Sequence, residues 1–294
     1  MKKTGLYILL LAFMVGSCGG PKQSINYQVL AENAFNEGNY QQAINELNTY
    51  IQEQELKGEE PNPKVYSDLA EANFHLKKMN EAERYYNWAM TENTISPELN
   101  VKMSKYYRDI DNLSKEITAL EYYRDNFSKA KGNMMMRNRL FETYIESENW
   151  KKAEKSWKNL DEETRSSEDF VKLYFELNKQ LENTEKCDEM ARKLLKFDEN
   201  NQRALEWLAK KYYNMGENRY QKAMDTYNRK KTTKNYNILL KELDQVTADL
   251  KKSVRYFDKL WEMEDGKKYA IYLANIYVRF DDKKKADYYK SFIQ

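Results

Sequence analysis

The sequence predicts an all-α protein built from antiparallel helix pairs. Helix breakers are scarce: all four Pro lie before residue 98, and after the N-terminal segment Gly occurs only at positions 38, 58, 132, 216 and 266. Apolar residues recur three and four positions apart, as on one helix face, and alternating apolar runs typical of strands are missing. At 294 residues the chain exceeds the usual single-domain size, which favours two domains or an elongated repeat array.

The clearest unit of this pattern spans residues 197–216. Its polar residues 198–201 can cap a helix start with side-chain oxygens. Apolar residues then follow at helical spacing: Leu205, Leu208, Ala209 and Tyr212. We expect Gly216 to end this helix, because Gly readily adopts positive φ.

Small residues recur where each second helix is expected to open. The positions are 43, 82, 116, 153 and 187, so the successive spacings are 39, 34, 37 and 34 residues. The occupants are Ala43, Ala82, Glu116, Ala153 and Cys187, and only Glu116 departs from the rule. Together with Leu208-Ala209, Tyr212 and Gly216, this pattern resembles the tetratricopeptide (TPR) repeat, whose period is 34 residues.

The TPR resemblance covers residues 25–230 and 267–293. It implies an α-solenoid superhelix of antiparallel helix pairs that serves as a scaffold presenting a groove, and not an enzyme. Residues 217–265 contain neither Gly nor Pro, and apolar steps of three and four predict one long helix near 233–264. We therefore expect a TPR array of about six repeats over 25–230, the long helix within 231–265, and a TPR-like capping helix pair over 266–294.

Residues 1–17 are expected to be a lipoprotein signal peptide, and 18–24 a lipidated tether. Lys2 and Lys3 precede an apolar run, residues 6–15, that is too short to span a bilayer as a stable helix. The run ends in Val15-Gly16-Ser17-Cys18, which resembles a bacterial lipobox and implies a lipid on Cys18. An ordinary secretory signal or an uncleaved anchor stays open, and an unprocessed N-terminus would leave a cytoplasmic scaffold.

A lipobox followed by a TPR array is loosely similar to the TPR lipoprotein of the outer-membrane β-barrel assembly machinery. It is equally similar to lipoproteins of gliding and secretion machines. The resemblance implies attachment to the bacterial outer membrane and another envelope protein or peptide segment as the partner.

The composition argues against several function classes. Without residues 1–17 the chain has 49 − 2 = 47 basic and 47 acidic residues, so bulk charge does not attract nucleic acid. One His and no Cys pair provide no metal-ligand cluster, and Cys187 fits a buried small-residue position better than a nucleophile. No phosphate loop, dinucleotide fingerprint or G-x-S-x-G motif occurs. We expect no catalytic residue, metal or cofactor.

The candidate partner-binding residues follow from the TPR resemblance. In TPR arrays the first helix of each pair lines the concave face, chiefly one residue after its small position and three to four beyond. This rule selects Glu32, Phe35, Asn36, Glu71, Phe74, His75, Lys105, Arg108, Lys210 and Tyr213. Rings, amides and both charge signs suit an extended segment of another protein. The alternatives are a glycan- or peptide-binding accessory lipoprotein with a small-ligand groove, and binding by the long helix at 233–264.

Overall fold

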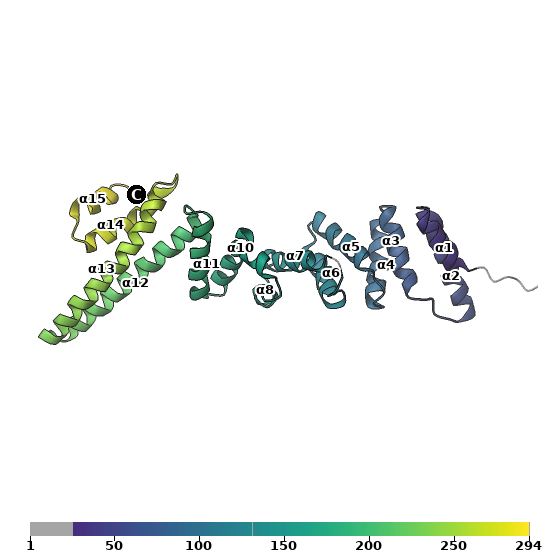
Figure 1. Cartoon of the computed structure of the whole chain (residues 1–294), viewed down its shortest axis with the longest axis horizontal. Coiled ribbons are helices and arrows are strands. Elements are labelled where there is room, and N and C mark those ends of the chain that lie inside the picture. Colours follow the sequence, from purple (N-terminus) through teal and green to yellow (C-terminus); the bar gives the residue numbers. More distant parts are fainter. Residues whose placement is uncertain (1–25, 131, 294) are drawn as a thin grey trace, which may run out of the picture. The chain divides into compact units, whose positions relative to one another are not determined.

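The computed structural model describes residues 26–130 and 132–293, and helices are the only regular elements there (Figure 1). The predicted all-α fold of antiparallel helix pairs is confirmed. The chain divides into two compact units between Leu99 and Asn100. Cys18 and the expected signal peptide lie outside the described residues.

Unit 1 contains two helix pairs. They are α1 (Tyr27–Asn36) with α2 (Tyr40–Lys57), and α3 (Lys64–His75) with α4 (Met79–Thr91). The second helix of one pair packs on the first helix of the next through one buried cluster that includes Ala31, Leu47 and Leu69. Each pair thus buries its apolar face partly on itself and partly on its neighbour, as expected of a repeat array.

Unit 2 continues the pairing. The unit boundary lies within α5 (Pro97–Asp109), and Val101 of this helix packs against the cluster that contains Leu120 and Tyr123 of α6 (Leu113–Asn126). The next elements are α7 (Asn133–Glu146), α8 (Trp150–Trp157), the short α9 (Glu162–Ser166), α10 (Glu168–Gln180) and α11 (Thr184–Phe197). Of the described helices, none combines the length and apolar character needed to cross a bilayer.

One turn recurs between the two helices of a pair and fixes the repeat register. A residue with positive φ stands seven positions after the small position of the first helix, and in most pairs it is not glycine. The residues are Gly38, Lys77, Asp111, Glu148, Glu182 and Asp281. After it the backbone bonds back five residues, as from Asn112 N to Tyr107 O at 2.8 Å, so the carbonyl groups at the helix end are satisfied.

The expectation that Gly216 ends a helix is wrong. Helix α12 (Gln202–Arg229) runs through Gly216 without interruption and forms an antiparallel hairpin with α13 (Thr233–Trp261). Gly216 is buried, and a Cβ there would lie 2.8 Å from Leu250 Cδ2 on α13. The glycine therefore permits close approach of two helices and makes no turn. The predicted long helix is confirmed as α13.

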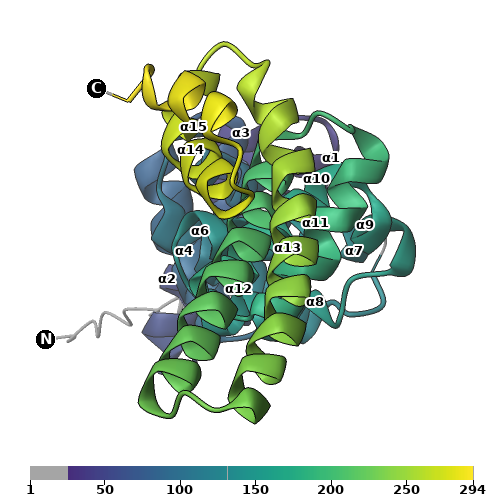
Figure 2. The same ribbon diagram turned by 90° about the vertical axis from the view of Figure 1, so that its left-hand side faces the viewer.

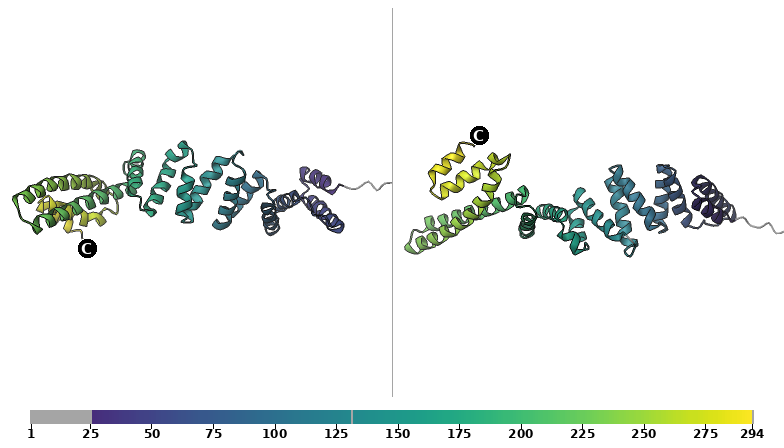
Figure 3. Two further views of the ribbon diagram at one scale, coloured as in Figure 1. Left: turned by 90° about the horizontal axis from the view of Figure 1, so that it is seen from below. Right: turned by 45° about the horizontal axis from the view of Figure 1, so that its top comes forward.

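The C-terminal helices pack on one part of this hairpin (Figures 2 and 3). They are η1 (Gly266–Tyr269), α14 (Ala270–Arg279) and α15 (Lys283–Lys290). Phe257 of α13 stacks on Tyr272 of α14 with ring centroids 4.9 Å apart. Arg279 forms an ion pair with Glu217 of α12 at 2.8 Å. These contacts leave the connection between α12 and α13 outside the C-terminal cluster.

Candidate partner-binding grooves

Two grooves are candidates for partner binding, and each lies between the first helices of neighbouring pairs. The acidic groove belongs to unit 1 and has a volume of about 390 Å³. It is lined by Gln28, Ala31, Glu32, Phe35, Asn36, Leu47, Asn62, Lys64, Asp68 and Glu71. The tryptophan groove belongs to unit 2 and has a volume of about 960 Å³. It is lined by Phe175, Glu176, Lys179, Thr184, Arg203, Glu206, Trp207, Lys210, Lys211 and Asn214.

The acidic groove has an excess of carboxylates. Its lining contains Glu32, Asp68 and Glu71 against Lys64, so 3 − 1 leaves two negative charges. Lys64 Nζ lies 3.5 Å from Asp68 Oδ2. Burial raises the pKa of Asp68 above its ordinary value, Glu71 and Glu32 add to the shift, and Lys64 opposes it. A cationic group entering this groove would relieve the repulsion among the carboxylates.

An aromatic cluster stands beside the acidic groove. Tyr40 and His75 stack with centroids 4.3 Å apart, and Phe35 meets both rings edge-on. His75 Nε2 also lies 3.9 Å from Glu71 Oε1. Phe35 thus belongs both to the groove lining and to the packing of α1, α2 and α3, so its role is partly structural.

The predicted residues of the first helices are only partly brought together. Glu32, Phe35, Asn36 and Glu71 line the acidic groove, and His75 stands beside it. Phe74 is half-buried, contacts the edge of His75 and is not part of the lining.

Two predicted cations lie outside both grooves. Lys105 and Arg108 are exposed on α5 in unit 2, and neither contributes to the lining of the tryptophan groove. Their positions follow the same sequence rule, but the groove of unit 2 forms farther along the chain.

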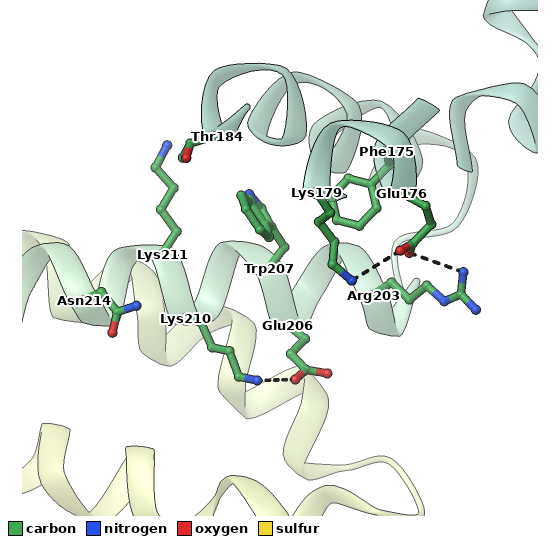
Figure 4. A pocket seen from close by; sticks show the side chains of 10 residues that line it. All are labelled: Phe175, Glu176, Lys179, Thr184, Arg203, Glu206, Trp207, Lys210, Lys211 and Asn214. Atoms are coloured by element: carbon green, nitrogen blue, oxygen red, sulfur yellow. Dashed lines mark hydrogen bonds and ion pairs between the residues drawn. The ribbon is translucent and has the colours of Figure 1, made fainter. Parts of the chain in front are cut away.

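The tryptophan groove is built on an aromatic pair (Figure 4). Trp207 of α12 is half-buried and meets the buried Phe175 of α10 edge-on, with centroids 5.8 Å apart. Trp207 Nε1 donates a hydrogen bond to Asp188 Oδ1 of α11 at 2.9 Å. Lys211 pairs with the other oxygen of Asp188. The indole is therefore held in place while part of it stays accessible.

Cations and carboxylates alternate around this aromatic pair. Glu176 accepts from Lys179 at 3.2 Å and from Arg203 at 3.4 Å (Figure 4). Glu206 pairs with Lys210 and accepts a hydrogen bond from Tyr269 OH at 3.0 Å. Burial by itself would raise the pKa of Glu206, but these two hydrogen bonds lower it overall. With Asp188 counted, four cations face three carboxylates, so 4 − 3 leaves one positive charge.

Lys210 and Tyr213 were both predicted, but they have different surroundings. Lys210 lines the tryptophan groove, next to the lining residue Asn214. Tyr213 instead packs on α14, where it meets Tyr272 edge-on at 5.1 Å and accepts a hydrogen bond from Asn275 Nδ2 at 3.2 Å. Tyr213 therefore helps to attach the C-terminal helices to α12.

Sequence reasoning missed most of the tryptophan groove. Glu176 and Lys179 stand one and four residues after Phe175, which occupies the small-residue position of α10. The offsets that selected Lys210 therefore also select them, but a large residue at the reference position hid the register. Trp207 and Arg203 do not stand at these offsets. They line the groove because α12 contacts α10 there, through Phe175 and Glu176.

Residues with potential for metal or nucleophilic chemistry are not gathered at either groove. No three His, Cys, Asp or Glu side chains are close enough to hold a metal ion within the described ranges. Cys187 is fully buried, as predicted for a small-residue position, and burial raises the pKa of its thiol to about 11. A thiol held neutral in this way is a poor nucleophile.

No protein-family model matches the chain, and no curated protein matches it. Several solved structures are similar at low identity. A Bacteroides ovatus protein has a TM-score of 0.46 at 16% identity, covering 64% of this chain and 98% of that one. The C-terminal part of a TPR repeat-containing protein from Cytophaga hutchinsonii has a TM-score of 0.43 at 16% identity, covering 91% and 94%. A tetratricopeptide repeat protein from Parabacteroides merdae has a TM-score of 0.37 at 15% identity, covering 91% and 92%.

Proposed function

We propose that this protein is a lipid-anchored interaction scaffold of a bacterial envelope complex. Its partner is an extended segment of another envelope protein, held in the tryptophan groove. The observation that carries the proposal is the combination of a positioned, half-buried indole with a rim of alternating charges. An aromatic surface supplies contact area, and paired charges on the rim select and orient a polypeptide.

The chemistry of the lining supports binding over catalysis. Each of its cations forms an ion pair with a neighbouring carboxylate: Lys179 and Arg203 with Glu176, Lys210 with Glu206, and Lys211 with Asp188. Thr184 contributes the only hydroxyl among the ten lining residues. A nucleophile with an adjacent base is thus not assembled there, whereas ion pairs that can exchange partners are.

A small-ligand accessory function is the second candidate. A groove of about 960 Å³ falls within the size range of small-molecule sites, and Trp207 could stack on a sugar or a peptide side chain. The two candidates differ in what the groove retains. The scaffold gives a crosslinked protein partner, and the accessory gives saturable binding of a small ligand without one.

The groove assignment is tested by crosslinking in whole cells, followed by pull-down and mass spectrometry. Trp207→Ala should lower partner capture about 30-fold, because a central aromatic anchor contributes about 2 kcal/mol. Lys210→Glu should weaken capture as well while leaving Trp207 in place. The matched control is Trp88→Ala, which removes a half-exposed indole of α4 outside both grooves. Undiminished capture by both groove variants, with helix content unchanged, would move the binding site elsewhere.

The anchor is tested separately. Cys18→Ala should release the protein from the membrane fraction, because the lipobox Cys would carry the lipid. Unchanged membrane fractionation of this variant would exclude lipidation at Cys18 and would leave the groove proposal standing.

A further inference from the structure

The connection between α12 and α13 is a defined structural element, here named the hairpin tip (residues 226–241). Thr232 caps α13 by accepting a hydrogen bond from Asn235 N at 3.2 Å. Asn235 Nδ2 donates to Lys230 O at 2.7 Å across the turn. The rings of Tyr227 and Tyr236 lie 5.8 Å apart and join the two helices just behind it. The tip is therefore a closed end and not two frayed helix termini.

The hairpin tip is strongly basic. Residues 226–241 contain five cations and neither Asp nor Glu. The cations are Arg229, Lys230, Lys231, Lys234 and Lys241, and all five are exposed. None of the five forms an ion pair with any residue that the structure describes. Farther back, Arg219 is paired with Glu242 at 3.0 Å and with Asp249 at 3.4 Å.

Apolar side chains are exposed on the same element. Tyr236, Ile238 and Leu240 are 47%, 41% and 45% exposed. Leu239, between the last two, is buried against the hairpin. At 3.6 residues per turn, Ile238 and Leu240 project on opposite sides of Leu239. Aliphatic side chains thus emerge on both flanks of α13 within one turn of Lys241.

The hairpin tip is free of the C-terminal helices. Contacts from Arg279 of α14 reach α12 at Glu217, through an ion pair, and at Tyr220, through a cation–π contact of 3.9 Å. Beyond these residues the hairpin continues by more than two turns before it closes. Figures 1 and 2 show the closed end on the side of the hairpin away from α14 and α15.

We propose that the hairpin tip docks on an anionic lipid bilayer. Its five cations lie at the phosphates of the headgroups, while Tyr236 and Leu240, four residues apart on one face of α13, enter the layer just beneath them. Charge complementarity alone would fit any polyanion. The exposed aliphatic side chains favour a bilayer, because only there does an apolar layer lie directly under the anionic groups. This docking site is separate from the tryptophan groove and does not depend on a lipid at Cys18.

The test reports on the tip alone. The full-length chain carries Cys18→Ser, so that no lipid is attached, and Asn237→Cys labelled with the environment-sensitive dye NBD. Cys187 is fully buried and is protected from labelling. With vesicles of phosphatidylcholine and phosphatidylglycerol, NBD emission should shift to the blue and intensify. Pure phosphatidylcholine should give no such change, and high salt should abolish the signal.

Paired variants separate charge from apolar insertion. Lys230→Gln with Lys231→Gln should weaken vesicle binding about 30-fold, because each lysine at an anionic surface contributes about 1 kcal/mol. Lys283→Gln with Lys284→Gln removes the same charge from exposed positions of α15 and should change binding less than about twofold. Leu240→Ser should remove the blue shift, whereas Val278→Ser, on the exposed face of α14, should not.

Three results would overturn the proposal. The first is an equal NBD response on pure phosphatidylcholine. The second is an NBD response that the Lys230→Gln, Lys231→Gln pair and the Lys283→Gln, Lys284→Gln pair reduce to the same extent. The third is no response on anionic vesicles while the Lys230→Gln, Lys231→Gln chain loses a crosslinked acidic protein in cells, which would assign the tip to a protein partner.

Discussion

Glu116 shows how a single residue can depart from the repeat pattern and still be accommodated. It stands where the second helix of a pair opens on a small residue, and its side chain is only 2% exposed. Arg139 of α7 holds both of its oxygens, with Nε–Oε1 at 2.7 Å and Nη2–Oε2 at 2.9 Å. Arg139 also bonds to Glu146 at 2.7 Å. These hydrogen bonds raise the pKa of Arg139. A buried ion pair thus replaces close packing at this position.

Glu116→Gln should lower the free energy of unfolding by about 2 kcal/mol, because it leaves a half-buried guanidinium with one carboxylate fewer. Glu146→Gln is the control: its carboxylate is 48% exposed, and its loss should cost less than about 1 kcal/mol. Urea unfolding followed by circular dichroism measures both. Equal effects of the two substitutions would contradict a special role for burial at Glu116.

Asp68 gives the acidic groove a predictable pH response. Because burial raises its pKa above the ordinary 3.8, the folded state favours the neutral carboxyl more than the unfolded state does. This contribution is present at low pH and is lost as the pH rises through the folded-state pKa. Asp68→Asn should therefore raise the melting temperature near pH 7, with the gain shrinking as the pH falls towards about 4. A gain that is independent of pH would argue against titration of Asp68.

At the level of elements, helix pairing was predictable, whereas the role of glycine was not. Ala43, Ala82 and Ala153 are fully buried, as their spacing predicted. The turns then form at Glu148 and Glu182 without glycine, with φ of 57° and 55°. Gly216 stands where the pattern predicts a helix end, yet it lies within a helix. Glycine is needed there because Leu250 on α13 leaves no room for a Cβ. A local sequence window shows that glycine is needed but does not distinguish a turn from a close approach.

The candidate site, like the helix pairing, was predictable only in part. Residues at fixed offsets on the first helices, such as Glu32 and Lys210, do line grooves. Trp207 could not be found in this way, because its position depends on Phe175 of α10 and Asp188 of α11. Tyr213 obeys the offset rule but faces α14, a helix that lies outside the regular repeat. Offsets therefore predict the face of a helix, and neighbouring elements decide whether that face is open.

A double-mutant cycle tests the close approach at Gly216. Gly216→Ala alone should destabilise by about 1 kcal/mol, because the clash with buried Leu250 outweighs the better helix propensity of Ala. In a Leu250→Ala background the clash is gone, so the same substitution should stabilise by about 1 kcal/mol. Unfolding midpoints of the four proteins give the coupling. A destabilising effect of equal size in both backgrounds would instead indicate a backbone constraint at Gly216.

At the scale of the whole molecule, a near-neutral composition conceals segregated charge. The formal net charge of the full chain is only +2, yet the acidic groove has an excess of carboxylates and residues 226–241 contain five cations without an acid. The bulk balance therefore argues only against a uniformly charged surface. The proposals above therefore rest on local surfaces, the two grooves and the hairpin tip, and not on the net charge.

The packing of unit 2 predicts how a disturbance spreads along it. Its buried clusters are distinct but linked by shared neighbours: Tyr174 lies against two of them, as do Leu195 and Tyr256. Because each helix pair contacts mainly its neighbours, a local loss of packing should weaken with distance. Leu140→Ala, at 1% exposure between α6 and α8, should cost about 3 kcal/mol and accelerate amide exchange most in α6–α8.

A matching substitution in another cluster of unit 2 tests the same prediction. Leu260 is fully buried in the cluster that joins α12, α13 and α14, so Leu260→Ala should accelerate exchange most there and least in α6–α8. Hydrogen exchange read by mass spectrometry measures both gradients in one experiment. Opposite gradients are expected, because the cluster around α10 and α11 shares Tyr174 with the first cluster and Leu195 and Tyr256 with the second. Uniform acceleration across unit 2 by either substitution would mean that its helix pairs open together as a single cooperative body.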